Sequence, residues 1–162
     1  MTTFEREVLT MPAGGSYEFV KRHFVYTCPP PKRGRGNNYN FKPFLYLAVR
    51  EGNGGRMEWL FKVVKRYILP KDMAEIKKMK IDSADMCQIE AYWTDPEVVR
   101  FAVDEYKDDA FVQFYVLDKN HSIRLRMPMK PMGRNWQGTR YLDLFDFFGT
   151  GKGVKLVPAH KE

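Results

Sequence analysis

Apolar runs separated by polar punctuation predict a hairpin near the middle of the chain. Residues 44–51, FLYLAVRE, are nearly all apolar, which is typical of a strand buried on both faces. Residues 56–69, RMEWLFKVVKRYIL, form a second apolar segment in which lysines and an arginine mark the polar positions. GNGG at 52–55 is a tight-turn sequence, so the two segments predict paired strands.

Four further segments are predicted to be strands, because each is rich in β-branched and aromatic residues or alternates in polarity. The last of them sets Ile123, Leu125 and Met127 against two arginines, which predicts a half-buried strand with one cationic face. The four segments are residues 22–27, 86–93, 110–118 and 122–127.

Helical signals are fewer. Asp95 followed by Pro96 is typical of a helix start, since Asp accepts from the first free amides and Pro suits the first helical position. Apolar residues then recur at helical spacing, which predicts a core-facing surface made of Val99, Ala102, Val103 and Tyr106. Residues 141–148 predict another short helix, and residues 71–80 a short helix or an irregular connection.

These elements predict an α+β fold, with a mixed, strongly curved sheet or a small β-barrel of about six strands and two or three short helices. With 162 residues in all, we expect a single domain over 1–150 and a flexible polar tail over 151–162. The sequence has no apolar run of the ~20 residues that a membrane helix needs and no secretory signal. Only two cysteines are present, which favours a cytoplasmic protein with reduced thiols. We also expect no membrane partner and no cofactor.

The net charge of +7 is unevenly distributed along the chain. Residues 28–80 hold thirteen cations and four anions, residues 81–118 hold two cations and ten anions, and residues 119–162 hold nine cations and three anions. Basic blocks that meet in space would attract a polyanion such as DNA or RNA. The alternative is a solvated surface with mixed patches.

Two basic loops, each containing aromatic residues, favour the nucleic-acid interpretation. Glycines let the backbone approach a ligand, arginines offer forked donors to phosphate, and rings offer stacking faces to unstacked bases. The first loop supplies the candidates Lys32, Arg33, Arg35, Tyr39 and Lys42. The second loop supplies Lys130, Arg134, Trp136 and Arg140, and Trp93 is added as a ring at the end of a predicted strand.

Two other function classes remain open. Asp82, Asp85 and Glu90 could hold a metal in a nuclease, but Tyr92 stands where such sites place a lysine. The opposed charge blocks could instead serve a protein-interaction module. The sequence favours a binding module over an enzyme, and we assign no catalytic residue and no metal ligand.

The order of elements, with FLYLAV, a glycine turn, WLFKVVKRYILP and the late pair FVQFYVLDKNHSIRLRM, resembles the PUA-like superfamily, which includes the EVE and ASCH domains. The resemblance is architectural and covers about residues 17–148. It implies a small curved or barrel-like sheet that binds RNA or reads modified DNA bases in a pocket walled by aromatic residues. Tyr39, Trp93 and Trp136 are our candidates for that wall, chosen on their chemistry.

Overall fold

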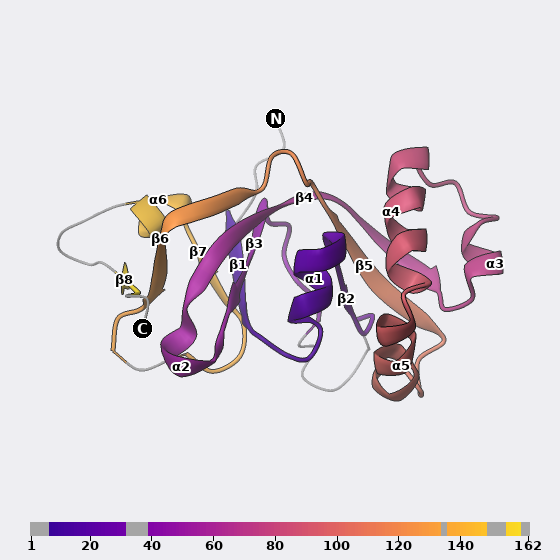
Figure 1. Ribbon diagram of the computed structural model, residues 1–162, viewed down its shortest axis with the longest axis horizontal. Helices are drawn as coiled ribbons and strands as arrows, with labels where there is room; N and C mark the ends of the chain where they lie inside the picture. The colour runs from indigo at the N-terminus through magenta and orange to yellow at the C-terminus, as the bar shows by residue number, and fades with distance from the viewer. Residues whose placement is uncertain (1–6, 32–38, 134–135, 149–154, 160–162) are drawn as a thin grey trace. The chain divides into compact units, whose positions relative to one another are not determined.

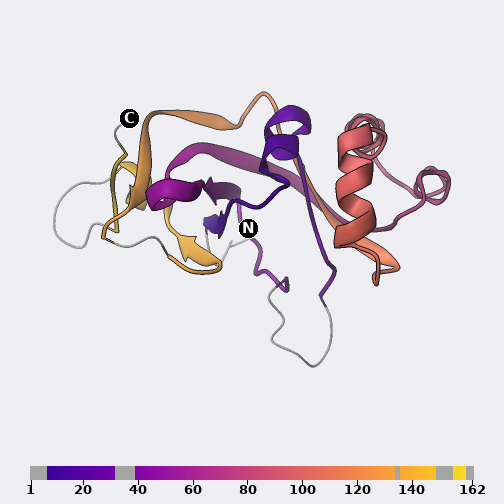
Figure 2. The same cartoon turned by 60° about the horizontal axis from the view of Figure 1, so that its bottom comes forward.

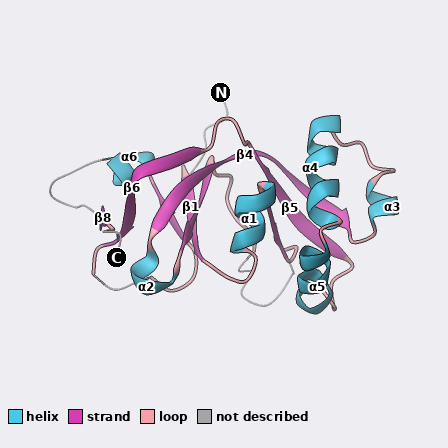
Figure 3. Ribbon diagram, in the orientation of Figure 1, coloured by secondary structure: helices cyan, strands magenta, loops and turns pink. Residues whose placement is uncertain are grey.

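The computed structural model describes residues 7–31, 39–133, 136–148 and 155–159, which contain eight strands and six helices (Figures 1 and 3). The predicted α+β class with a mixed sheet is confirmed. The chain divides into two compact units, each assembled from separate segments. The first unit draws on residues 1–14, 41–63 and 119–162, and the second on residues 15–40 and 64–118.

The first unit is built around β1, which lies between a parallel neighbour, β3, and an antiparallel neighbour, β7. In the same unit β6 pairs antiparallel with both β4 and β8. Its core contains Val8, Leu60, Leu142 and Leu156, all buried. The elements of this unit are β1 (Val8–Pro12), β3 (Tyr46–Arg50), α2 (Gly52–Gly55), the first half of β4 (Met57–Pro70), β6 (Ile123–Pro131), β7 (Arg140–Leu142), α6 (Leu144–Phe148) and β8 (Leu156–Pro158).

The second unit places helices on one face of a small sheet. In its strand order β5 lies between β2 and the second half of β4. Helix α4 runs beside β5 in both views (Figures 1 and 2), and rings such as Tyr92 and Phe114 fill the space between them. The elements are α1 (Tyr17–His23), β2 (Val25–Cys28), α3 (Met73–Ile76), α4 (Ser83–Trp93), α5 (Pro96–Glu105) and β5 (Phe111–Leu117).

The hairpin predicted from the glycine turn is confirmed. β3 and β4 pair antiparallel, with Tyr46 opposite Lys62. The GNGG turn forms the single helical turn α2, in which Gly54 has a φ of +91°, a conformation that glycine adopts without steric cost. The predicted strand at 110–118 is β5, and the predicted start of α5 is confirmed, because the Asp95 side chain accepts from the Glu97 amide.

Residues 86–93 were predicted to be a strand, and this prediction is wrong: they belong to helix α4. The apolar residues Met86, Ile89 and Tyr92 recur every three residues, which brings them to one helical face against the core. The predicted strand at 22–27 is also corrected at its start. Arg22 belongs to α1, which ends at Phe24 with a φ of +53° before β2 begins.

The buried face of α5 differs from the predicted one. Val98 is fully buried, whereas Val99 and Val103 are 45% and 66% exposed. The sequence spacing fits both faces, and packing selects the one that holds Val98 and Tyr106. None of the described helices combines the length and the hydropathy of a membrane-spanning segment.

Strand β6 and the C-terminal segment also differ from the predictions. Met127 is exposed and only Leu125 of the predicted alternation is buried, because the pairing of β4 with β6 shifts register between Met57 and Trp59. The segment expected to be a flexible tail contains β8, which pairs with β6 and buries Leu156.

Candidate functional site

The first unit contains a buried arginine. Arg50 stands at the end of β3 with 1% of its surface exposed. Its guanidinium donates to the Thr10 hydroxyl and to the Gly138 carbonyl. Its Nε atom has no hydrogen-bond partner among the described residues, and no described carboxylate forms an ion pair with Arg50. A buried cation without an anion is costly, so the arrangement calls for an explanation.

Arg50 shares an aromatic ring with a second arginine. The Cζ atom of Arg50 lies 5.8 Å from the centroid of the Trp136 ring, and that of Arg140 lies 5.1 Å from the same centroid. Trp136 is half-buried and Arg140 is exposed. We call Arg50, Trp136 and Arg140 the arginine–tryptophan cluster. Two cations on one ring concentrate positive charge at a place where an indole is open to solvent.

Strand pairing positions this cluster. Thr10 lies on β1 opposite Arg140 of β7, and its hydroxyl donates to the Arg140 carbonyl at 3.2 Å. Pro12 of β1 lies opposite Arg50 of β3, so the central strand fixes both arginines. Gly138, with a φ of +65°, turns the chain so that its carbonyl meets the Arg50 guanidinium.

The electrostatics of the cluster favour an anion. Burial lowers the pKa of Arg50 from 12.5 to about 10, and the nearby Arg140 charge adds to the effect. Arg50 nevertheless remains protonated at neutral pH. A phosphate group bound through charge-assisted hydrogen bonds to the exposed Arg140 would bring to the cluster the negative charge that the described side chains do not supply.

The structure brings together two of the residues predicted from the sequence, Trp136 and Arg140. The exposed Lys42 lies nearby in the fold, since its backbone N–H donates to the Tyr141 hydroxyl at 2.9 Å on β7. Lys130 lies on β6, with its side chain beside the α2 turn at Gly54. The candidates Lys32, Arg33, Arg35 and Arg134 lie outside the described residues.

The other two predicted residues belong to the second unit. Trp93 packs among buried rings, with its ring centroid 5.2 Å from that of Phe114, and its indole N–H donates to the Lys71 carbonyl. These contacts account for Trp93 without a ligand. Tyr39 is half-buried, its carbonyl accepts from the Gln113 amide at 3.1 Å, and burial raises its pKa.

The three acids of the alternative nuclease hypothesis are not grouped as metal ligands among the described residues. Asp85 accepts a hydrogen bond from the Tyr67 hydroxyl at 2.6 Å, and Glu90 forms an ion pair with Lys77 at 2.9 Å. In the part of the chain that the structure describes, no group of three or more metal-ligating side chains is found. The predicted nuclease site is therefore not assembled by these residues.

Arg50 is the residue that sequence reasoning missed. It lies in the segment 44–51, which the sequence predicts to be a strand buried on both faces, and the sequence analysis assigns it no role. The available signal was its place at the end of the run YLAVR, directly after the buried residues 47–49. The identity of its partners, Thr10 and Gly138, depends on pairings across 40 and 88 residues, which no local pattern reports.

No protein-family model matches the chain, and no curated protein matches its sequence. The structure is similar to crystal structures of two ZmASCH variants from Zymomonas mobilis. A serine-to-alanine variant aligns with a TM-score of 0.42 and 9% identity over 88% of this chain and 92% of that one. A tyrosine-to-phenylalanine variant aligns with a TM-score of 0.36 and 9% identity over 96% of this chain and 92% of that one.

Proposed function

We propose that the chain is a nucleic-acid-binding module in which the exposed Arg140 contacts backbone phosphate and the buried Arg50 adds positive charge behind it. The observation that carries this proposal is the buried Arg50 guanidinium, which has no carboxylate partner among the described residues and lies beside Trp136 and Arg140. A polyanion supplies the missing negative charge, and the half-exposed indole offers apolar contact to sugar or base.

The charge of the whole chain supports this proposal. The net charge is +7, and the block that contains Arg50 and the block that contains Arg140 are the two basic ones. Such a charge raises the rate of association with nucleic acid. It also makes the affinity depend on salt, because lysines and arginines that neutralise phosphates release the counterions bound to the nucleic acid. A more specific version of the proposal is that the chain recognises an unstacked or modified base, which stacks on the Trp136 ring.

The test is fluorescence anisotropy with labelled single-stranded and duplex DNA and RNA at about 50 and 200 mM salt. We expect salt-dependent binding of at least one probe. Arg140→Gln should weaken it and reduce the slope of log affinity against log salt by about 0.7–0.9, the value of one phosphate contact. The matched control is Arg100→Gln, which removes an exposed arginine from α5.

Three outcomes would contradict the proposal. Equal effects of Arg140→Gln and Arg100→Gln would remove the arginine–tryptophan cluster from the interface. Equal affinity for heparin and nucleic acid would indicate a general polyanion or protein-interaction surface. Probes cut in the presence of magnesium would show an enzyme, contrary to the binding role proposed.

A further inference from the structure

The sheet of the second unit has a face that its helices do not cover. Strand pairing sets Tyr26 opposite Tyr115 and Cys28 opposite Gln113. Because side chains alternate along a strand, these four residues share one face. The other face carries Val112, Phe114 and Val116, which pack in the core cluster with residues of α4 and α5.

Gln113 is the polar centre of this face. Its Nε2 atom lies 3.1 Å from Cys28 Sγ, 3.5 Å from the Pro29 carbonyl and 3.1 Å from the Tyr39 carbonyl. Its Oε1 atom accepts from Arg66 Nε and from the Tyr115 hydroxyl. The Gln113 side chain is fully buried, and both its amide nitrogen and its amide oxygen form hydrogen bonds. It is therefore held in one position and can orient the groups that it contacts.

Arg66 is oriented by the Gln113 amide. Its side chain comes from β4 and is exposed, and its Nε–H is held by Gln113. Among the described residues, Arg66 has neither a carboxylate in an ion pair nor a hydrogen bond to its two terminal amino groups. A guanidinium fixed at Nε presents its remaining donors in one orientation, which suits the oxygens of a phosphate.

Exposed apolar residues surround this cation. Val64 and Ile68 lie two positions before and after Arg66 on β4, and they are 51% and 46% exposed. Phe111 lies two positions before Gln113 on the neighbouring strand β5 and is 47% exposed. We call Val64, Arg66, Ile68 and Phe111 the strand patch. An oriented cation and an exposed ring on neighbouring strands are the combination that can hold a phosphate and an unstacked base together.

We propose that the strand patch is a binding site for single-stranded nucleic acid, in which Arg66 contacts a phosphate and Phe111 stacks on a base. This inference rests on the proposed nucleic-acid function but concerns a different unit and different residues. Gln113 is a positioning residue that acts through Arg66. A duplex keeps its bases stacked on one another, so Phe111 has no base face to contact in a duplex probe.

The test compares single-stranded and duplex probes of equal length with Phe111→Ala, Arg66→Gln and Arg66→Lys. Phe111→Ala should weaken single-strand binding at least about fivefold and leave the salt slope unchanged, since stacking involves no counterion release. Arg66→Gln should lower the single-strand salt slope by about 0.7. Arg66→Lys should keep that slope and still lose affinity, because lysine keeps the charge without the Nε bond to Gln113.

Matched controls are Phe145→Ala, which removes a 75% exposed ring from α6, and Arg100→Gln on α5. If Arg140→Gln weakens binding while the strand-patch variants behave like these controls, the inference is overturned and the proposed function stands. Equal losses for duplex and single strand in Phe111→Ala would overturn the assignment to single strands. If the wild-type chain binds none of the probes, the proposed function and this inference both fail.

Discussion

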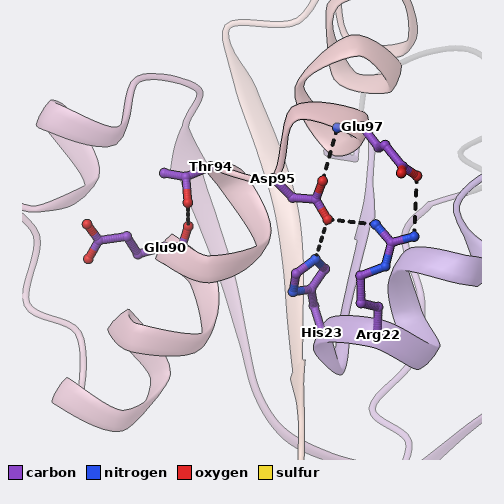
Figure 4. Close-up of polar contacts among 6 residues, drawn as sticks. All are labelled: Arg22, His23, Glu90, Thr94, Asp95 and Glu97. Atoms are coloured by element: carbon purple, nitrogen blue, oxygen red, sulfur yellow. Dashed lines mark hydrogen bonds and ion pairs between the residues drawn. The ribbon is translucent and has the colours of Figure 1, made fainter.

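His23 Nε2 lies 2.7 Å from Asp95 Oδ2, and the same carboxylate oxygen accepts from Arg22 Nη1 at 2.8 Å (Figure 4). These contacts join the last turn of α1 to the residue that caps α5. The hydrogen bond from His23, followed by that from Arg22, holds the pKa of Asp95 well below its usual range. The contact between these two helices therefore depends on the charge of Asp95, and hence on pH.

We predict that this carboxylate contributes to acid unfolding. A group with a depressed pKa in the folded state stabilises the fold above its unfolded pKa of about 4 and loses that contribution as the pH falls towards the folded value. Asp95→Asn keeps an oxygen to cap α5 but removes the charge. Chemical denaturation of wild type and Asp95→Asn between about pH 6 and pH 2.5 should show the difference in stability shrinking as acid is added.

The control for the acid experiment is Asp104→Asn, an exposed acid on the same helix. Its effect on the free energy of unfolding should be smaller than that of Asp95→Asn at neutral pH. A constant difference between wild type and Asp95→Asn over the whole pH range would show that the charge of Asp95 does not contribute.

We also predict that replacing Arg50 changes the stability of the fold little but weakens binding to nucleic acid. Arg50→Met fills the same space without a buried charge, and such replacements are often neutral or stabilising. The free energy of unfolding should change by no more than about 1 kcal/mol or increase, while affinity for nucleic acid falls. Thermal denaturation and anisotropy on the same preparation measure both. A large loss of stability with unchanged affinity would make Arg50 purely structural.

A buried hydroxyl network in the second unit gives a prediction about additivity. Thr27 Oγ1 lies 2.7 Å from the Tyr92 hydroxyl and accepts from the Tyr106 hydroxyl at 2.8 Å. Thr27→Val leaves two buried phenols without their partner and should cost about 2–4 kcal/mol. Adding Tyr92→Phe and Tyr106→Phe removes those unpaired groups and should restore part of the loss. Strictly additive effects in urea denaturation would contradict a shared network.

The last described strand should be part of the fold. Leu156 on β8 is 1% exposed and packs in the core of the first unit. Leu156→Ala should lower the free energy of unfolding by about 2–5 kcal/mol, the cost of a cavity in a well-packed core. Val157→Ala on the same strand, at a half-buried position, should cost less. Equal and small effects would mean that β8 contributes little.

Strong local signals allowed part of this fold to be predicted. GNGG between two apolar segments specified the β3–β4 hairpin, and Asp95 with Pro96 specified the start of α5. For α4, apolar and polar residues were read as alternating over MCQIEAYW. The spacing of Met86, Ile89 and Tyr92, three residues apart, fits a helix instead.

The candidate site was only partly predictable for a physical reason. Trp136 and Arg140 were recognised because a ring and a cation in one polar loop are visible locally. Arg50 is recognised by its burial and by its contacts with Thr10 on β1 and with Gly138. These contacts exist only after the strands have paired, so the sequence alone does not reveal them. Arg66 is similar, since the amide that orients it lies 47 residues away on β5.

The assembly of each unit from separate segments limits what proteolysis can yield. The first unit takes residues from both ends of the chain and from the middle, so a single cut between residues 15 and 118 separates segments that fold together. The second unit stays on one fragment only when the cut falls before residue 15 or after residue 118. A chain nicked in the exposed turn at Lys119–Asn120 would therefore have to keep its two pieces associated to retain the arginine–tryptophan cluster, since Arg50 and Arg140 would then lie on different polypeptides.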